Sequence, residues 1–162
     1  MTDTNGIPSH SICMVVEGGD ANSIASTIAA KKTPGCGTYG NTSETIVDTY
    51  NVPHVIRFAR PENVNVTVQI TIHPLAGYTS LIGTSVINAV VSYINSLDIG
   101  QSVYLTRLFV PANLSNSADA ATFEVTGIKI ARDGGTPAAS DVAIAFDEAA
   151  LTTSTLVTIT TA

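Results

Sequence analysis

Residues 64–72 alternate strictly between apolar and polar side chains, and no other feature constrains the fold as much. The apolar members are Val64, Val66, Val68, Ile70 and Ile72, and the polar members are Asn65, Thr67, Gln69 and Thr71. In an extended chain, consecutive side chains point to opposite faces. The run therefore predicts a strand with one face in a hydrophobic core and the other face in water.

The residues after this strand predict helices and then further strands. A helix opens at Thr79 or Ser80, because apolar residues then recur near every fourth position as far as Leu97. A shorter helix is expected over 103–109, ended by Pro111. Strands are expected over 122–131, 142–146 and 156–160. This order, β-α-α-β-β-β, favours an antiparallel or mixed sheet with the helices on one face.

The first sixty residues predict a smaller unit. An apolar run over 11–17 reads as a buried strand, and a helix follows over 21–32 with Asp20 as its N-cap. A hairpin is expected from 42–49 and 53–60.

A boundary is expected at Pro61-Glu62-Asn63. The sequence thus predicts an α+β chain of two small modules, residues 1–61 and 62–162. Each would hold a short antiparallel or mixed sheet with one or two helices packed on one face. Modules of this size bury a modest share of their surface and gain stability from neighbours.

The chain has an unusually low content of charged residues. They make up 12% of it, against roughly 25% in typical soluble domains. Such a surface resists association poorly, which favours a protein whose exterior is covered by partners. The alternative is a Thr-rich monomer. The net charge of −6 argues against nucleic acid and anionic membranes as partners. Residues 1–6 lack the features of a signal peptide.

One glycine-rich motif resembles a nucleotide site. Residues 35–40 match G-x-G-x-x-G, but that fingerprint needs a preceding strand and a following helix, and here the predicted order is reversed. The three histidines have no partners at metal-ligand spacing. No catalytic residue, cofactor site or metal site is therefore predicted, and the chain is expected not to be an enzyme.

Arg57 and Arg60 are the candidate contact residues. They lie on a predicted strand in a chain with few positive charges. One interpretation is a salt bridge to a neighbouring subunit. The other is that they are solvated charges on an edge strand that deter aggregation.

Several segments together resemble the C-terminal half of the baseplate J-like proteins, wedge components of contractile phage tails. They are GIPSHSI at 6–12, VVEGGD at 15–20, IASTI at 24–28, KTPGCGTYG at 32–40, VPH at 52–54 and FARP at 58–61, with looser similarity at Ile94, 99–103, Ile144 and 148–150. The family tends to have an aromatic residue where Cys13 stands. Its members also carry an N-terminal portion that builds the ring around the tube, which these residues do not include.

The resemblance implies a structural subunit of a baseplate wedge, present in several copies around a symmetric tail. Its partners would be other wedge and tail proteins, with no cofactor, and its location would be the virion after assembly in the bacterial cytoplasm. An alternative is a host-recognition module of a tail fibre or tip, although the chain has no Trp and few aromatic residues. A hydrolase of cell-wall material is a third hypothesis.

Overall fold

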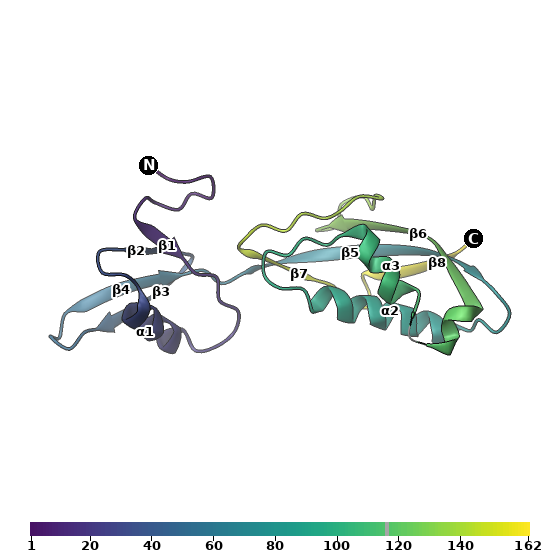
Figure 1. The fold of residues 1–162 in the computed structure, drawn as a ribbon, viewed down its shortest axis with the longest axis horizontal. Coiled ribbons are helices and arrows are strands. Elements are labelled where there is room, and N and C mark those ends of the chain that lie inside the picture. The colour runs from purple at the N-terminus through teal and green to yellow at the C-terminus, as the bar shows by residue number, and fades with distance from the viewer. Residues whose placement is uncertain (116) are drawn as a thin grey trace. The chain divides into compact units, whose positions relative to one another are not determined.

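The computed structural model describes residues 1–115 and 117–162 (Figure 1). The chain forms two compact units, Met1–Glu62 and Asn63–Ala162. Each unit combines strands with helical structure, so the protein is a small α+β fold.

The first unit contains one helix and two pairs of strands. Its elements are β1 (Ser11–Cys13), α1 (Ala21–Lys31), β2 (Gly37–Tyr39), β3 (Thr42–Val47) and β4 (Pro53–Phe58). β1 and β2 pair in parallel, whereas β3 and β4 form an antiparallel hairpin.

The helix α1 begins where the sequence predicts. The Asp20 carboxylate accepts hydrogen bonds from the backbone N–H of Ser23 (2.8 Å) and from its hydroxyl (2.9 Å), which confirms Asp20 as the N-cap. On the inner face of the helix, Ala25 and Ile28 are buried in one cluster with Ile56 and Phe58 of β4. The helix is therefore held by a small core as well as by its cap.

The predicted strand over 11–17 is wrong beyond Cys13. β1 ends at that residue, and Val15 makes only an isolated parallel bridge with Ala59. The side chains of β1 are half-buried. The strand is short because its partner β2 contributes only three residues.

The second unit is built on a long strand. Its elements are β5 (Glu62–Pro74), α2 (Ser80–Asn95), α3 (Leu105–Ala112), the 3-10 helix η1 (Ala118–Thr122), β6 (Phe123–Arg132), β7 (Glu148–Leu151) and β8 (Val157–Thr161). β5 lies in the middle of the sheet, with β6 on one side and β7 on the other, and β8 also pairs with β5. β6 runs antiparallel and β8 parallel to β5, so this sheet is mixed.

The alternation in β5 has the predicted effect. Its apolar side chains, from Val64 to Ile72, are buried, and the polar side chains between them are exposed or half-buried. Side chains of α2 and α3, including Val86 and Leu108, share one core with them. The two helices therefore cover one face of the sheet (Figure 1).

Two predictions for the second unit are wrong. Residues 142–146 form no strand, and Val142 makes only an isolated bridge with Val103. The strand is β7, which begins at Glu148. Pro111 does not end α3 but lies in its last turn, where the Asn113 N–H still bonds to the Phe109 carbonyl (3.0 Å).

Candidate subunit-contact site

Arg60 connects parts of the first unit that are far apart in the sequence. Its guanidinium donates hydrogen bonds to the carbonyl oxygens of Val16 (3.0 Å), Gly19 (2.8 Å) and Gly18. Three carbonyls of one loop thus converge on a single cation. Since Arg presents a rigid fork of donors, it fixes the shape of this loop.

The backbone of Arg60 is also fixed by hydrogen bonds. The Asn41 side chain accepts from the Arg60 N–H (2.8 Å) and donates to the Arg60 carbonyl (3.1 Å). The guanidinium carbon also lies 5.1 Å from the centre of the Phe58 ring, within the range of a cation–π contact. Arg60 is therefore a structural residue of its own unit.

Arg57 lies in a different environment. It is on β4, its side chain is exposed, and its backbone N–H donates to the Thr38 hydroxyl (2.9 Å). Within the described part of the chain, its guanidinium has no hydrogen bond or ion pair. The structure thus places the two predicted contact residues differently, with Arg60 bound to a loop and Arg57 open to solvent.

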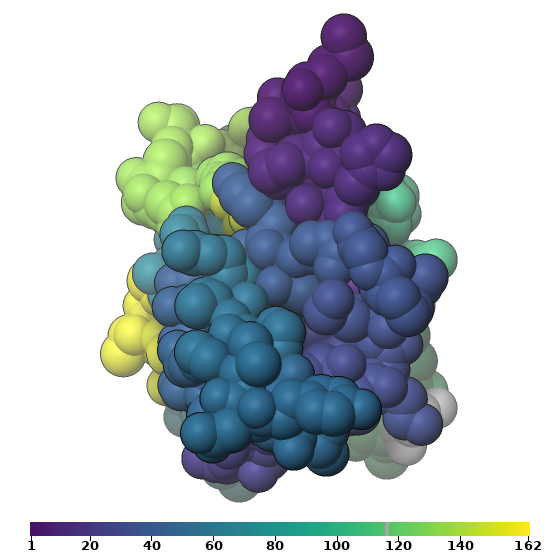
Figure 2. Space-filling model, turned by 90° about the vertical axis from the view of Figure 1, so that its left-hand side faces the viewer, coloured from purple at the N-terminus to yellow at the C-terminus, as the bar shows by residue number. Residues whose placement is uncertain are grey.

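Arg57 belongs to a partly apolar surface, which we call the hairpin outer face. It consists of Ser43, Thr45 and Val47 of β3 and Pro53, Val55 and Arg57 of β4, which are all exposed and lie opposite one another in the register. Val47 is 54% exposed and Val55 is 58% exposed. In Figure 2, the blue segment that includes the hairpin lies at the surface of the first unit.

The tip of the hairpin adds two exposed apolar residues, Tyr50 (86%) and Val52 (47%). The Asp48 carboxylate holds this turn, accepting from the N–H groups of Tyr50 (2.8 Å) and Val52 (2.9 Å) and contacting His54 Nε2 (2.9 Å). The bond from Val52, and then that from His54, keep the pKa of Asp48 below its ordinary value. The apolar residues are therefore presented on a fixed turn. Neither residue is a predicted contact residue, although the connection of the predicted hairpin, between 49 and 53, already implies their exposure.

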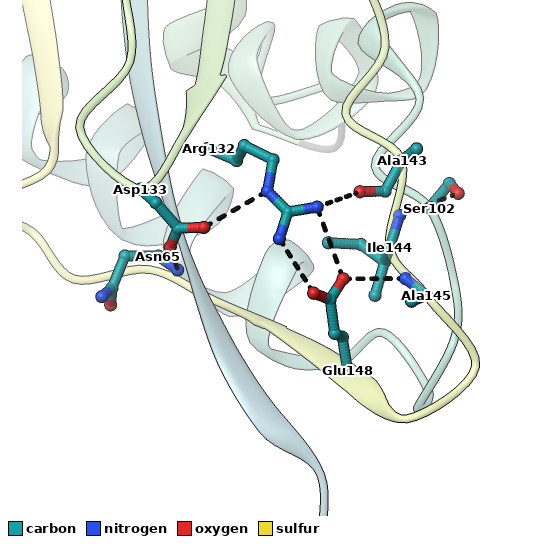
Figure 3. A network of polar contacts seen from close by, with 8 residues as sticks. All are labelled: Asn65, Ser102, Arg132, Asp133, Ala143, Ile144, Ala145 and Glu148. Atoms are coloured by element: carbon teal, nitrogen blue, oxygen red, sulfur yellow. Dashed lines mark hydrogen bonds and ion pairs between the residues drawn. The ribbon is translucent and has the colours of Figure 1, made fainter. Parts of the chain in front are cut away.

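The second unit holds an ionic network (Figure 3). Arg132, at the end of β6, donates to both carboxylate oxygens of Glu148 (2.9 and 3.4 Å), to the Ala143 carbonyl (3.2 Å) and to Asp133 (3.2 Å). Glu148 also accepts from the Ala145 N–H (2.8 Å). Arg132 lowers the pKa of Glu148, and Glu148 raises the pKa of Arg132. The network fastens the irregular segment between β6 and β7.

The other motifs noted in the sequence form neither a nucleotide site nor a metal site among the described residues. The glycine-rich residues 35–40 follow a helix and contain β2, so the strand–loop–helix order of a dinucleotide site is not present there. Among residues 1–115 and 117–162, no three His, Cys, Asp or Glu side chains are grouped as a metal would require. In the same ranges, every helix is too short or too polar to cross a membrane.

No protein-family model matches the chain, and no curated protein matches it either.

Proposed function

We propose that this protein is a structural subunit of the baseplate wedge of a contractile phage tail, and that it works by contacting neighbouring subunits. It carries out no reaction in this role. Its partners are other wedge and tail proteins, and several copies surround the tail axis.

The observation that supports this most is how the segments that resemble the baseplate J-like proteins are used. Two of them, at 15–20 and 58–61, lie far apart in the sequence yet meet at Arg60. The Gly18-Gly19 loop supplies carbonyls to its guanidinium, and Phe58 lies under it. Motif residues therefore bind one another and stabilise a fold. This is the pattern of a structural signature, whereas a catalytic motif would direct side chains toward a substrate.

The surface is consistent with this role. The hairpin outer face exposes two valines beside Arg57, whose guanidinium has no hydrogen bond or ion pair among the described residues. Few charges elsewhere oppose association, since the whole chain carries 7 basic and 13 acidic residues. A surface of this kind suits a protein that is covered in its assembly.

The test is to tag the chain in the bacterium that encodes it, induce the phage or prophage, and purify intact tails. We expect the chain to co-purify with tail sheath and other baseplate proteins, and labelling in electron micrographs to fall at the baseplate end. Deleting the gene should abolish complete tails. Purified tails that lack the chain would contradict the proposal.

The tails made by the deletion strain also distinguish a baseplate subunit from a host-recognition module. If the deletion leaves complete contractile tails that fail to adsorb to cells, the chain is a recognition module. If tails are missing, it is an assembly component.

A further inference from the structure

The outer edge of β3 is open. Arg57 directs its N–H away from β3, toward Thr38, so the pair Ser43–Arg57 is one that exchanges no backbone hydrogen bonds. The two kinds of pair alternate along an antiparallel ladder, so the pairs Thr45–Val55 and Val47–Pro53 exchange no backbone hydrogen bonds either. The backbone groups of Ser43, Thr45 and Val47 therefore point outward, and within the described residues none of them has a hydrogen-bond partner.

This edge has little of the usual protection, since the one charged residue of β3 is Glu44, which is half-buried on the same face as Ile46. Proteins block exposed edges with proline, lysine, a bulge or a covering segment. β3 has the sequence TSETIV and pairs with β4 in unbroken register, and four of its six residues are β-branched. Residues of this kind favour pairing with another strand.

From this geometry we infer that β3 pairs antiparallel with β3 of a second copy of the chain, in a register centred on Thr45. Ser43 then lies opposite Val47 of the other copy, and Thr45 lies opposite its own counterpart. Each of these pairs exchanges two backbone hydrogen bonds, which satisfies all the outward groups of both strands. Two hairpins thereby join into one continuous four-stranded sheet.

Charge selects this register over its neighbours. Moving the centre to Glu44 would place two Glu44 carboxylates opposite each other, and moving it to Ile46 would place Glu44 opposite Asp48. Like charges directly opposite one another destabilise a strand pair. Centred on Thr45, Glu44 instead faces Ile46 of the second copy.

The helix α1 packs against β3, so this pairing brings the two copies of α1 close together. In the paired sheet the two copies of α1 lie on the same face, because the symmetry axis is perpendicular to the sheet. The exposed side chains in the body of α1 are small: Asn22, Ser23, Ser26, Thr27 and Ala30. Small side chains allow two helices to approach closely.

A cross-linking experiment tests the register directly, in the complete chain with Cys13→Ala and Cys36→Ser. The change Thr45→Cys places two thiols on directly opposed residues about 5.5 Å apart at Cα, which a disulfide can span. The matched control is Thr42→Cys, whose two copies would be about 20 Å apart. We expect a disulfide-linked dimer under mild oxidation from Thr45→Cys and none from Thr42→Cys. Equal cross-linking from both variants would overturn the inference.

Sedimentation over a concentration series tests the association itself. Thr45→Pro removes only an outward N–H, so the hairpin should remain folded by circular dichroism, while dimerisation should weaken about tenfold or more. A monomeric parent chain would overturn the inference, as would a dimer unaffected by Thr45→Pro. The inference depends on β3 alone, so its failure would leave the proposed baseplate role untouched, and that role is tested separately on purified tails.

Discussion

Gly40 lies against the main chain of Phe58, with no space between them for a side chain. A Cβ atom at position 40 would overlap the carbonyl group of Phe58 and would lie 2.5 Å from the amide nitrogen of Ala59. This contact brings the loop after β2 onto the end of β4. It explains why residue 40 is a glycine. This residue ends the segment 32–40, which resembles the baseplate J-like proteins.

Replacing this glycine should therefore disrupt the first unit. We expect Gly40→Ala to lower its free energy of unfolding by about 3 kcal/mol or more, since main chain has to move on both sides of the contact. Thermal unfolding followed by circular dichroism measures the loss. Gly127→Ala is the control, because a Cβ there meets nothing within 4 Å. A loss at Gly40 no larger than the control's would contradict this account of the contact.

The two arginines should differ sharply in their effect on stability. Arg60→Met removes the hydrogen bonds to three carbonyls and should cost the first unit about 2 kcal/mol. Arg57→Met removes an exposed side chain and should change stability by less than about 0.5 kcal/mol. Denaturant unfolding of the two variants side by side measures both values. Similar losses in both would show that Arg60 is not a structural residue.

Local pattern predicted much of the fold. The alternation from Val64 to Ile72 predicted β5 and its buried face, and Asp20 predicted the start of α1. Both signals act within a few residues, because side-chain period and N-capping are properties of the local chain. The fold class follows from such signals combined.

The errors arose where distant partners decide the structure. Val142 and Ile144 alternate with less apolar residues like a strand, but this segment forms only one bridge. Both side chains are buried because they pack into the core of the second unit. The role of Arg60 was equally hidden, since its partners are main-chain carbonyls, and every residue type has these. The three residues of β2 are too few to give a periodic signal.

The ion pair between Arg132 and Glu148 should make the second unit sensitive to acid. The pKa of Glu148 is lowered in the folded protein, so its contribution to stability is present above the pKa of the unfolded chain, about 4.3. That contribution is lost as the pH falls through the lower, folded value. We expect Glu148→Gln to reduce the melting temperature at pH 7 and to reduce it by less as the pH falls toward 3.

The control for this titration is Glu124→Gln on β6, because Glu124 is exposed and takes part in no ion pair within the described residues. Its melting temperature should follow that of the parent chain at every pH. A Glu148→Gln deficit that stays constant down to pH 3 would show that the loss comes from packing and not from ionisation.

The helix α3 depends on a cap from outside its own sequence. Tyr104 precedes the helix and offers no capping side chain, but the Asp141 carboxylate accepts a hydrogen bond from the Leu105 N–H (2.8 Å). An acidic group at this end also interacts favourably with the helix dipole. Asp141→Ala should therefore cost the second unit about 1 kcal/mol. Asp147→Ala, on the same segment but away from the helix start, should cost less. Hydrogen exchange locates the effect: amides in the first turn of α3 should lose protection in Asp141→Ala alone, because an uncapped turn frays before the rest of the unit opens.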